Sequence, residues 1–433
     1  MASLIDGFLE GLKNPKTGGL VCTVQELVEN QYGIPLKHYA QQYLFGATGL
    51  RLQVFNSIQG PKGSNKSTTL FDLMGSICGA EELGWLGGLA VLYEMECKIS
   101  PSILKSILSR YGEEAVKSVI IRKGMTIEQA LSDINKVIIP LYVKLCPKRN
   151  KPLIIGIDSI GGSASEDTIK KLQTSDTPGK GYYDKQHYLK YWCENQGVIF
   201  EREGIPIVII CINQEREQAS ATGYGPPQKV ITGGKAQLFK DGHMLSARAV
   251  KLNSDDGTLV YLSTVKTAFC DARKIEVEFR WNKYGQKFDD AYEARFNWGL
   301  AAARCLDSPD KGVGEIRDIC DVKVSDDKHL VTCPQLNLRS VDPDEFEAAL
   351  MANQEILDQL YTYQKIEKLK GLDEFAEYSA AVRARMAGKA PKEEEPKEEK
   401  PKAAKPKAAP KAKPKQEAVS VLDATDIGKE EGK

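Results

Sequence analysis

The feature that most constrains this chain is a glycine- and lysine-containing stretch that follows an apolar run and opens a helix. The apolar run covers residues 52–58, the helix is predicted from Ser67 to about Gly79, and the stretch between them reads Gly60-Pro61-Lys62-Gly63-Ser64-Asn65-Lys66-Ser67. A strand, loop and helix in this order surround phosphate oxygens with backbone N–H groups and the positive end of the helix. In such a loop the lysine adds a cation and the next hydroxyl holds Mg²⁺, and these roles fall to Lys66 and Ser67.

The stretch departs from the usual phosphate-loop pattern at Asn65, where G-x-x-x-x-G-K-[ST] has a glycine. Asparagine is the residue that tolerates a left-handed backbone best after glycine. A surface turn between unrelated elements is the alternative interpretation of so short a match. The strands and acidic residues that follow favour the phosphate loop.

Composition excludes several classes of protein. The 433 residues carry 59 basic and 59 acidic side chains, so any nucleic-acid surface must be local. The ten cysteines form no C-x-x-C pair, which argues against zinc and indicates reduced thiols. No apolar span reaches the ~18 residues of a membrane helix, and the start of the chain lacks a signal-peptide pattern. We expect a soluble cytoplasmic protein without a membrane partner.

Apolar runs alternate with helix patterns from residue 52 to about residue 281. This alternation is typical of an α/β fold whose mainly parallel, twisted sheet is covered on both faces. One helix begins at Thr126 with Gln129 three residues later, a predicted capping box. We expect the last three runs to extend the sheet as antiparallel strands. The runs cover residues 52–58, 89–93, 119–121, 153–157, 205–212, 244–252, 259–265 and 275–281.

Four segments are predicted. Residues 1–45 form an N-terminal helical arm, which packs on its own core or on a neighbouring subunit. Residues 46–298 form the α/β core, and residues 299–386 form a small helical or mixed domain with a long helix beginning at Asp342-Pro343. Residues 387–433, rich in Lys, Pro and Glu, are expected to be disordered. Their basic part, residues 400–415, either touches phosphate backbones or solubilises the chain.

Acidic residues end two of the predicted strands. Asp158 ends the run 153–157, where a carboxylate holds Mg²⁺ or a Mg²⁺-bound water in nucleotide sites. Glu94 and Glu96 follow the run 89–93, at the edge where open α/β sheets bind ligands. One of them is placed to activate the water that attacks a γ-phosphate, and the alternative is a pair of solvated acids.

Two polar loops are predicted to leave the same edge. Gln214 ends the run 205–212 and is placed to sense a γ-phosphate, and residues 215–235 follow without apolar periodicity. Residues 161–180 follow Asp158 and carry Lys170 and Lys171. Basic side chains with an aromatic residue suit single-stranded nucleic acid.

The order of these segments resembles that of the RecA-like recombinases, most of all the UvsX-type recombinases of tailed phages. The resemblance covers about residues 34–298. It implies a RecA-like P-loop ATPase core and a DNA recombinase that forms a helical filament on single-stranded DNA and promotes pairing and strand exchange with double-stranded DNA. The ordered set is residues 60–68, 92–101 (LYEMECKISP), 125–129 (MTIEQ), 156–160 (GIDSI), 209–214 (IICINQ), 232–236 (TGGKA) and 265–267 (VKT).

The resemblance also implies partners and residue roles. ATP and Mg²⁺ are the cofactors, a single-strand-binding protein and a recombination mediator are further partners, and a phage-encoded chain would act in the cytoplasm of a bacterial host. Glu96 is the catalytic glutamate, Gln214 is the relay residue, and Lys266 reaches a neighbour's ATP, as do Arg273 and Lys274. The nucleotide is bound by Gly60, Pro61, Lys62, Gly63, Ser64, Asn65, Lys66, Ser67, Thr68 and Asp158, with Ser67 and Asp158 on the metal. DNA is bound by Lys170, Lys171, Arg216, Tyr224, Lys229, Gly233, Gly234 and Lys235.

Two other interpretations stay open. A hexameric helicase or a related ATPase shares this core, and its sequence pattern would make Glu94 the catalytic acid. The second interpretation is a DNA-binding scaffold that does not hydrolyse ATP. In that case Asn65, in place of glycine, would mark the loss of ATPase turnover. The sequence also differs from relatives at Ile103, where some have an aromatic residue against adenine.

Overall fold

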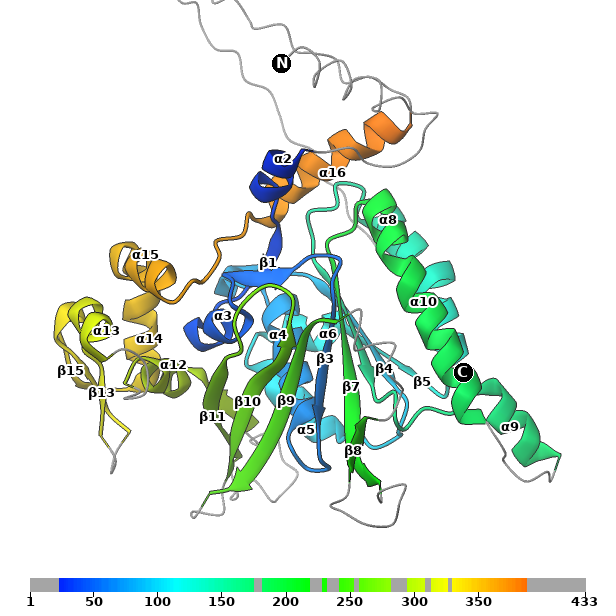
Figure 1. Cartoon of the computed structure of the whole chain (residues 1–433), viewed down its shortest axis with the longest axis horizontal. Coiled ribbons are helices and arrows are strands. Elements are labelled where there is room, and N and C mark those ends of the chain that lie inside the picture. The colour runs from blue at the N-terminus through cyan, green and yellow to red at the C-terminus, as the bar shows by residue number, and fades with distance from the viewer. Residues whose placement is uncertain are drawn as a thin grey trace, which may run out of the picture. The chain divides into compact units, whose positions relative to one another are not determined.

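The apolar runs of the sequence form the strands of one large sheet (Figure 1). The computed structural model describes residues 23–174, 181–218, 228–231, 241–252, 257–281, 294–307, 313–325 and 329–387. Ten described strands make up this sheet, in the order β12-β11-β10-β9-β3-β7-β6-β4-β5, with β8 paired to β7. The parallel strands are β3 (Phe55–Gly60), β4 (Leu89–Glu94), β5 (Val119–Lys123), β6 (Leu153–Asp158), β7 (Ile207–Gln218) and β9 (Asp241–Lys251). The antiparallel strands are β8 (Gln228–Ile231), β10 (Gly257–Thr267), β11 (Lys274–Trp281) and β12 (Ala294–Asn297).

The predicted α/β class and mainly parallel sheet are confirmed. The prediction for the last three runs is right for β10 and β11, which pair antiparallel with their neighbours. It is wrong for β9, which lies parallel to β3 although it pairs antiparallel with β10. β8 runs antiparallel to β7, so the chain reverses direction once more before β9, and a pattern of apolar residues does not show this reversal.

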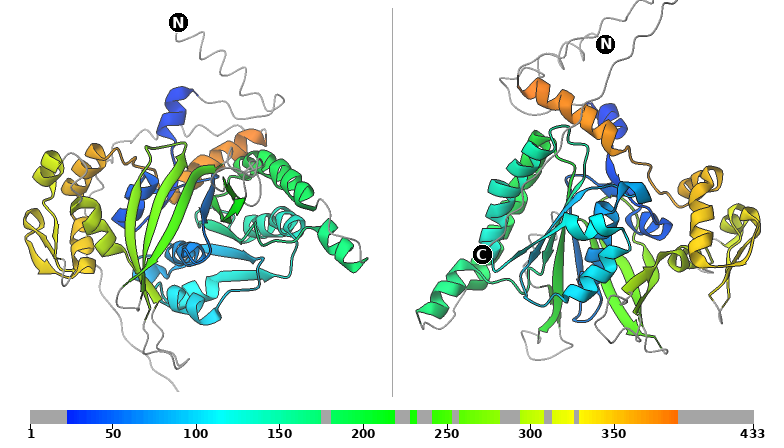
Figure 2. Two further views of the ribbon diagram at one scale, coloured as in Figure 1. Left: turned by 60° about the horizontal axis from the view of Figure 1, so that its bottom comes forward. Right: turned by 180° about the vertical axis from the view of Figure 1, so that it is seen from behind.

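Helices cover both faces of the sheet, because successive side chains of a strand point to opposite sides. In β4, Ala90 and Leu92 join one apolar core while Val91 and Tyr93 join the other. The first core contains α4 (Lys66–Cys78), α5 (Pro101–Ser109) and α6 (Glu113–Ser118). The second contains α7 (Ile127–Asp133), the π-helix η3 (Ile134–Ile138), α8 (Ile139–Leu145) and α10 (Gly181–Glu203). Figures 1 and 2 show the two helical layers on opposite sides of the central strands.

Local signals set several helix starts. The predicted capping box at Thr126 is present: its hydroxyl accepts the N–H of Gln129, whose side chain accepts the N–H of Thr126. The helix predicted after the phosphate loop is α4, which ends at Cys78 before Gly79. A short 3₁₀ turn, η2 (Glu81–Leu83), leads from it to β4. Burial of apolar side chains then stabilises these helices. Each fully buried Leu or Ile contributes roughly 1.5–3 kcal/mol.

The described part of the N-terminal segment packs partly on its own chain. Its elements are α2 (Val24–Glu29), β1 (Gly33–Pro35), α3 (Tyr39–Phe45) and β2 (Gly49–Arg51). Every residue of α3 is buried, and α3 contacts the helix α12 (Trp298–Asp307). In α2, by contrast, Val24, Leu27 and Val28 are exposed. Residues 1–22, which carry the predicted apolar spacing of the arm, lie outside the described residues.

The C-terminal segment combines helices with a small sheet. Its further elements are α13 (Val313–Ile319), β13 (Lys323–Val324), β14 (Val331–Cys333), the 3₁₀ turn η5 (Pro334–Leu336), β15 (Leu338–Val341), α14 (Pro343–Ala352), α15 (Gln354–Tyr363) and α16 (Leu372–Met386). The predicted long helix does begin after Asp342, which caps it, but it is two helices. Asn353 leaves the helical backbone, at φ −96° and ψ 89°, and its side chain accepts the N–H of Ile356 to start α15.

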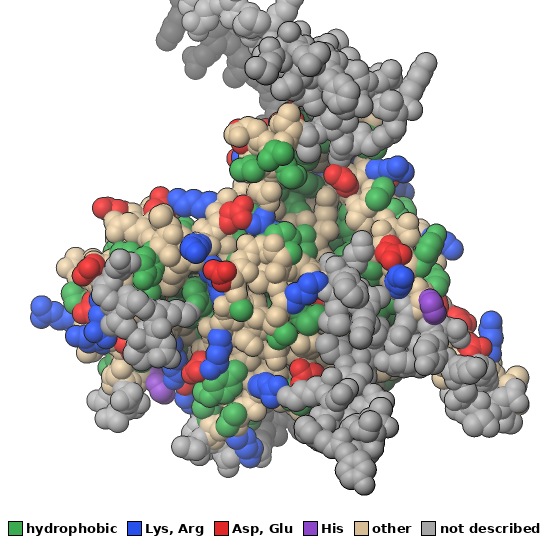
Figure 3. All heavy atoms as spheres, viewed as in Figure 1, with side chains coloured by type: hydrophobic (Ala, Val, Ile, Leu, Met, Phe, Trp, Pro, Cys, Tyr) green, Lys and Arg blue, Asp and Glu red, His purple; other side chains and the backbone are tan. Residues whose placement is uncertain are grey.

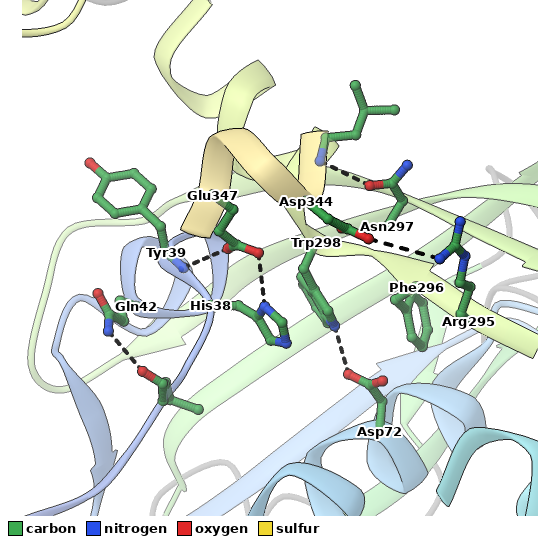
Figure 4. Close-up of polar contacts among 12 residues, drawn as sticks. His38, Tyr39, Gln42, Asp72, Arg295, Phe296, Asn297, Trp298, Asp344 and Glu347 are labelled. Carbon is green, nitrogen blue, oxygen red and sulfur yellow. Dashed lines mark hydrogen bonds and ion pairs between the residues drawn. The ribbon is translucent and has the colours of Figure 1, made fainter. Parts of the chain in front are cut away.

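A buried polar cluster connects α4 to the C-terminal segment (Figure 4). Asp72 accepts hydrogen bonds from the Tyr111 hydroxyl at 2.6 Å and the Trp298 indole at 2.7 Å. The ring of His38 stacks on Trp298 and pairs with Glu347 of α14 at 3.0 Å. Burial raises the pKa of Asp72 despite these donors. Helix α4 is therefore bonded directly to Tyr111 and Trp298, and through Trp298 it is connected to His38 and Glu347.

The visible surface carries mixed charge. In the view of Figure 3, Lys and Arg side chains alternate with Asp and Glu over the described residues, in keeping with the balanced composition. Within the described ranges, no helix combines the length and apolarity needed to cross a membrane. Residues 388–433, which hold almost all of the predicted disordered tail, lie outside the described residues.

Candidate active site

Two glycines and an asparagine shape the backbone between β3 and α4, the segment predicted as a phosphate loop. A side chain at Gly60 would place Cβ 2.1 Å from the carbonyl oxygen of Ala247, so glycine is required there by close approach. Gly63 has φ +77°, in the left-handed region that favours glycine. Asn65 also lies in this region, with φ 58° and ψ 27°. The asparagine thus adopts the conformation for which the usual motif has glycine.

The lysine of the loop is buried among polar groups. Lys66 is 7% exposed, and its ammonium donates to the Pro61 carbonyl at 2.6 Å and approaches the Ser64 hydroxyl at 3.3 Å. Burial lowers the pKa of Lys66, while Asp158 and Glu96 act in the opposite direction. The lysine therefore lies between the backbone of the loop and two carboxylates. A phosphate group held by the loop would lie against it.

The sheet brings the other predicted residues to the same edge. In the parallel register, Gly60 lies opposite Gln214, and Glu94 lies opposite Asp158. Strands β3, β7, β6 and β4 are consecutive neighbours, so these four positions form one row at the carboxyl ends of the strands. This edge is the one at which open α/β sheets bind ligands.

Ser67 and Asp158 lie together as a possible Mg²⁺ site. The Ser67 side chain lies near enough to the Asp158 carboxylate, which is 8% exposed, to lower its pKa. Burial raises the pKa of Asp158 to about 6, a rise that Ser67 and Lys66 oppose. Oxygen ligands of this kind fit Mg²⁺, which usually takes one or two protein groups beside phosphate and water. A proton on Asp158 would compete with the cation.

Glu96 contacts three polar side chains at this edge of the sheet. Its Oε1 accepts a hydrogen bond from Gln214 Nε2 at 2.6 Å and one from the Ser159 hydroxyl. Its Oε2 pairs with the Lys98 ammonium at 2.8 Å. The pKa of Glu96 lies below its usual value: burial would raise it, but the hydrogen bonds from Lys98 and Ser159 and the charge of Lys66 outweigh burial. Glu96 is thus ionised and oriented at neutral pH.

Glu94 is placed differently. It is 1% exposed, its Oε1 accepts the backbone N–H of Lys98 at 2.8 Å, and its Oε2 lies 3.8 Å from the Lys123 ammonium. These contacts hold the turn after β4 and its neighbour β5. Of the two acids, Glu96 is the one that contacts Gln214.

The two predicted DNA-binding segments begin beside Glu96. A Cβ on Gly162 would lie 2.3 Å from Glu96 Cγ, and the Gly162 N–H donates to the Ser159 hydroxyl at 3.1 Å. Gln214, on the other side, directly precedes the second segment. The catalytic candidate therefore contacts Gly162, the second residue of the first segment, and Gln214, the residue just before the second segment.

Neither segment is the continuous loop that the sequence predicts. The first contains α9 (Glu166–Gln173), because Ser165 accepts the N–H of Thr168 and acidic residues fill the first turn. Lys170 is exposed on α9. In the second, β7 continues to Gln218 and pairs with β8 as a hairpin, with Arg216 opposite Val230.

The remaining predicted DNA-binding residues lie on α9, on the β7–β8 hairpin or outside the described residues. Lys171 lies on α9, and Lys229 lies on β8 opposite Glu217. The side chains of Arg216, Lys171 and Lys229 are not among those described. Tyr224, Gly233, Gly234 and Lys235 lie outside the described residues.

Lys266 lies away from its own phosphate loop. In β10 it pairs with Met244, which also lies opposite Ser57 of β3. Ser57 precedes Gly60 by three residues, or about 10 Å along a strand. Two further strand spacings separate β10 from β3. The backbone of Lys266 therefore lies well away from Gly60 of its own chain.

Arg273 and Lys274, which were also predicted to reach a neighbour, lie in different surroundings. Arg273 is buried, and its guanidinium donates to backbone carbonyls of Tyr43, Gln364 and Lys365, so the prediction that it reaches a neighbour is wrong. These carbonyls end helices that need donors, which a sequence pattern does not show. Lys274 is exposed and pairs with Glu276 at 3.2 Å.

Several contacts of the site were not predicted. Ser159 and Gly162 contact Glu96, and Thr258 accepts a hydrogen bond from the Asn65 side chain at 2.6 Å. Ser159 directly follows the strand-ending Asp158, which is a usable signal, whereas nothing in the sequence links Thr258 to the loop. Ile103, on α5, packs partly buried against the first core.

No protein-family model matches the chain, and comparison with curated proteins gives no significant match.

Proposed function

We propose that the protein is a DNA-stimulated ATPase that assembles as a helical filament on single-stranded DNA and promotes homologous pairing and strand exchange. The observation that carries this proposal is the position of Glu96, which contacts both Gln214 and Gly162 at the starts of two polar segments. A polymer bound to those segments would act on the acid through these contacts. The resemblance to RecA-like recombinases supports the same function.

The residues of the site suit phosphoryl transfer. The loop from Gly60 to Ser67 offers N–H groups and the Lys66 ammonium to the phosphates of ATP. Mg²⁺, held by Ser67 and Asp158, would neutralise charge on the transferring group. Glu96 is ionised, and it lies beside Lys66, close enough for charge interaction. It is therefore suited to orient a water molecule and accept its proton.

The contacts of Glu96 suggest how DNA stimulates turnover. Oε1 is occupied by Gln214 and Ser159, so a water molecule can approach it better once one of these donors moves. Gln214 belongs to β7, which runs into the β7–β8 hairpin, and Ser159 accepts the Gly162 N–H. Binding of DNA to α9 or to the hairpin would shift these donors. Glu94, held by Lys98 and Lys123, lacks this connection, which favours the recombinase over the helicase interpretation.

A filament would bring Lys266 to a second nucleotide. Its distance from the phosphate loop of its own chain, described above, supports a role in trans. A lysine that contacts the γ-phosphate bound to the neighbouring subunit would stabilise the polymer for as long as that phosphate is present.

Electron microscopy with ATP and single-stranded DNA, combined with a phosphate-release assay, tests the proposal. We expect helical filaments, DNA-stimulated hydrolysis, and loss of hydrolysis in Lys66→Ala, because the cation on the phosphoryl group is removed. Lys117→Ala is the control, since Lys117 is an exposed partner of Glu113 and Glu114 on α6. Closed rings would support a helicase, and DNA-stimulated turnover that survives in Lys66→Ala would refute the proposed site.

A further inference from the structure

We propose that Thr258 is a positioning residue of the nucleotide site, which holds the phosphate loop in its binding conformation through Asn65. This inference rests on the proposed ATP site but concerns a strand that does not contact the phosphates. Asn65 Nδ2 donates to Thr258 Oγ1 at 2.6 Å. Thr258 is the second residue of β10, 193 residues away in sequence.

The Asn65 side chain is directed away from its own helix. As the N-cap of α4 it makes no side-chain capping bond, although asparagine commonly does so. Its carbonyl instead receives the N–H of Thr69 at 2.9 Å and the hydroxyls of Thr68 and Thr69 at 2.7 and 2.8 Å. The backbone of Asn65 is thus fixed by α4 and its side chain by β10.

Thr258 is a rigid anchor for this contact. It pairs with Lys251 of β9 on one side and with Phe279 of β11 on the other, so the strand cannot move without its neighbours. A glycine at position 65 would leave the peptide before Lys66 free to rotate. Asparagine bound to the sheet fixes that peptide before a phosphate arrives, and a preorganised site binds more tightly.

The hydrogen bond to Thr258 gives Asn65 a positioning role in the proposed nucleotide site. The usual motif obtains the left-handed backbone from glycine, whereas this chain obtains it from asparagine plus a partner. The scaffold interpretation takes Asn65 as a sign of lost turnover. The observed φ of 58° and the bond to Thr258 favour a working loop instead.

Four variants test the inference: Thr258→Val, Thr258→Ser, Asn65→Gly and the double variant Asn65→Gly/Thr258→Val. Affinity is measured with a fluorescent ATP analogue and Mg²⁺, and KM and kcat with the DNA-stimulated phosphate-release assay. We expect Thr258→Val to weaken binding by about threefold to tenfold, the worth of one neutral hydrogen bond, and to raise KM with little change in kcat. Thr258→Ser, which keeps the acceptor, should bind like the unaltered chain.

The double variant separates positioning from general damage. If Thr258 acts through Asn65, then Thr258→Val has no effect in the Asn65→Gly background, because the interaction is already absent. An equal loss of affinity in both backgrounds, or unchanged affinity in Thr258→Val, would overturn the inference while leaving the ATPase proposal standing. An unaltered chain that binds no ATP would overturn both. Urea denaturation without nucleotide confirms that each variant is folded.

Discussion

Asp158 should make the protein less stable at neutral pH than it would be with a neutral residue at that position. Burial raises the pKa of its carboxyl from 3.8 to about 6, and this is the net result after the opposing effects of Ser67 and Lys66. Between these two values the folded state keeps a proton that the unfolded chain loses. The free energy of unfolding therefore falls as pH rises through this window, and the full penalty is present above about pH 6.

The pKa rise from 3.8 to about 6 corresponds to a penalty of about 3 kcal/mol in the free energy of unfolding. Asp158→Asn keeps the shape of the side chain and an acceptor for Ser67 but removes the charge. We expect this variant to be more stable than the unaltered chain by up to about 3 kcal/mol near pH 8, and by about half as much near pH 5. The same substitution should abolish Mg²⁺-dependent turnover, because the carboxylate is lost.

Urea denaturation without nucleotide and with a chelator present, at the two pH values, measures the difference. Asp133→Asn is the matched control, since Asp133 is a buried carboxylate that pairs with Arg122 at 2.6 Å and accepts the Tyr93 hydroxyl at 2.8 Å. Losing that pair should destabilise the protein. An Asp158→Asn variant that is less stable near pH 8, or equally stabilised at both pH values, would refute the reasoning.

The remaining predictions concern the catalytic acid and the shared site. Glu96→Gln should stop hydrolysis while leaving ATP-bound filaments on DNA, and Glu94→Gln should reduce turnover less; a larger loss at Glu94, measured by phosphate release, would support the helicase interpretation. Lys66→Ala and Lys266→Ala should each be inactive alone, yet their mixture should recover part of the DNA-dependent ATPase, because a Lys66→Ala subunit can still lend Lys266 to an intact neighbour. No recovery from folded, co-assembled variants would contradict the site shared between subunits.

The strands and the edge of the sheet were predictable because buried parallel strands are nearly continuous apolar runs. The residues that end such runs, Asp158 and Gln214, must then meet at one edge. The helix α4 that follows residues 60–65 and the Thr126 capping box were predictable for a similar reason, since each is a local pattern with a local structure. Their prediction required no knowledge of distant contacts.

The rest depends on contacts between segments far apart in sequence. Ser159 and Glu96 are 63 residues apart, and Asn65 and Thr258 are 193 apart, so no window of sequence contains either pair. Helix α9 and the β7–β8 hairpin lie where polar composition indicated loops. A single well-placed cap at Ser165 and a few backbone pairs outweigh composition in these segments. At Asn353 the reverse holds, because a local cap interrupts an apolar periodicity that predicts one long helix.

Strand β10 has a different role at each end, and this gives the proposed polymer a direction. Thr258 near its start hydrogen-bonds to Asn65 of its own chain, and Lys266, about 26 Å further along the strand, is the residue that we propose contacts the nucleotide of a neighbour. Each protomer would thus connect two consecutive ATP molecules through one strand, with unlike groups at the two ends. Loss of a γ-phosphate would release the Lys266 end of one strand, and the disturbance would reach the next phosphate loop through Thr258. Hydrolysis would then pass along the filament from subunit to subunit with a fixed polarity.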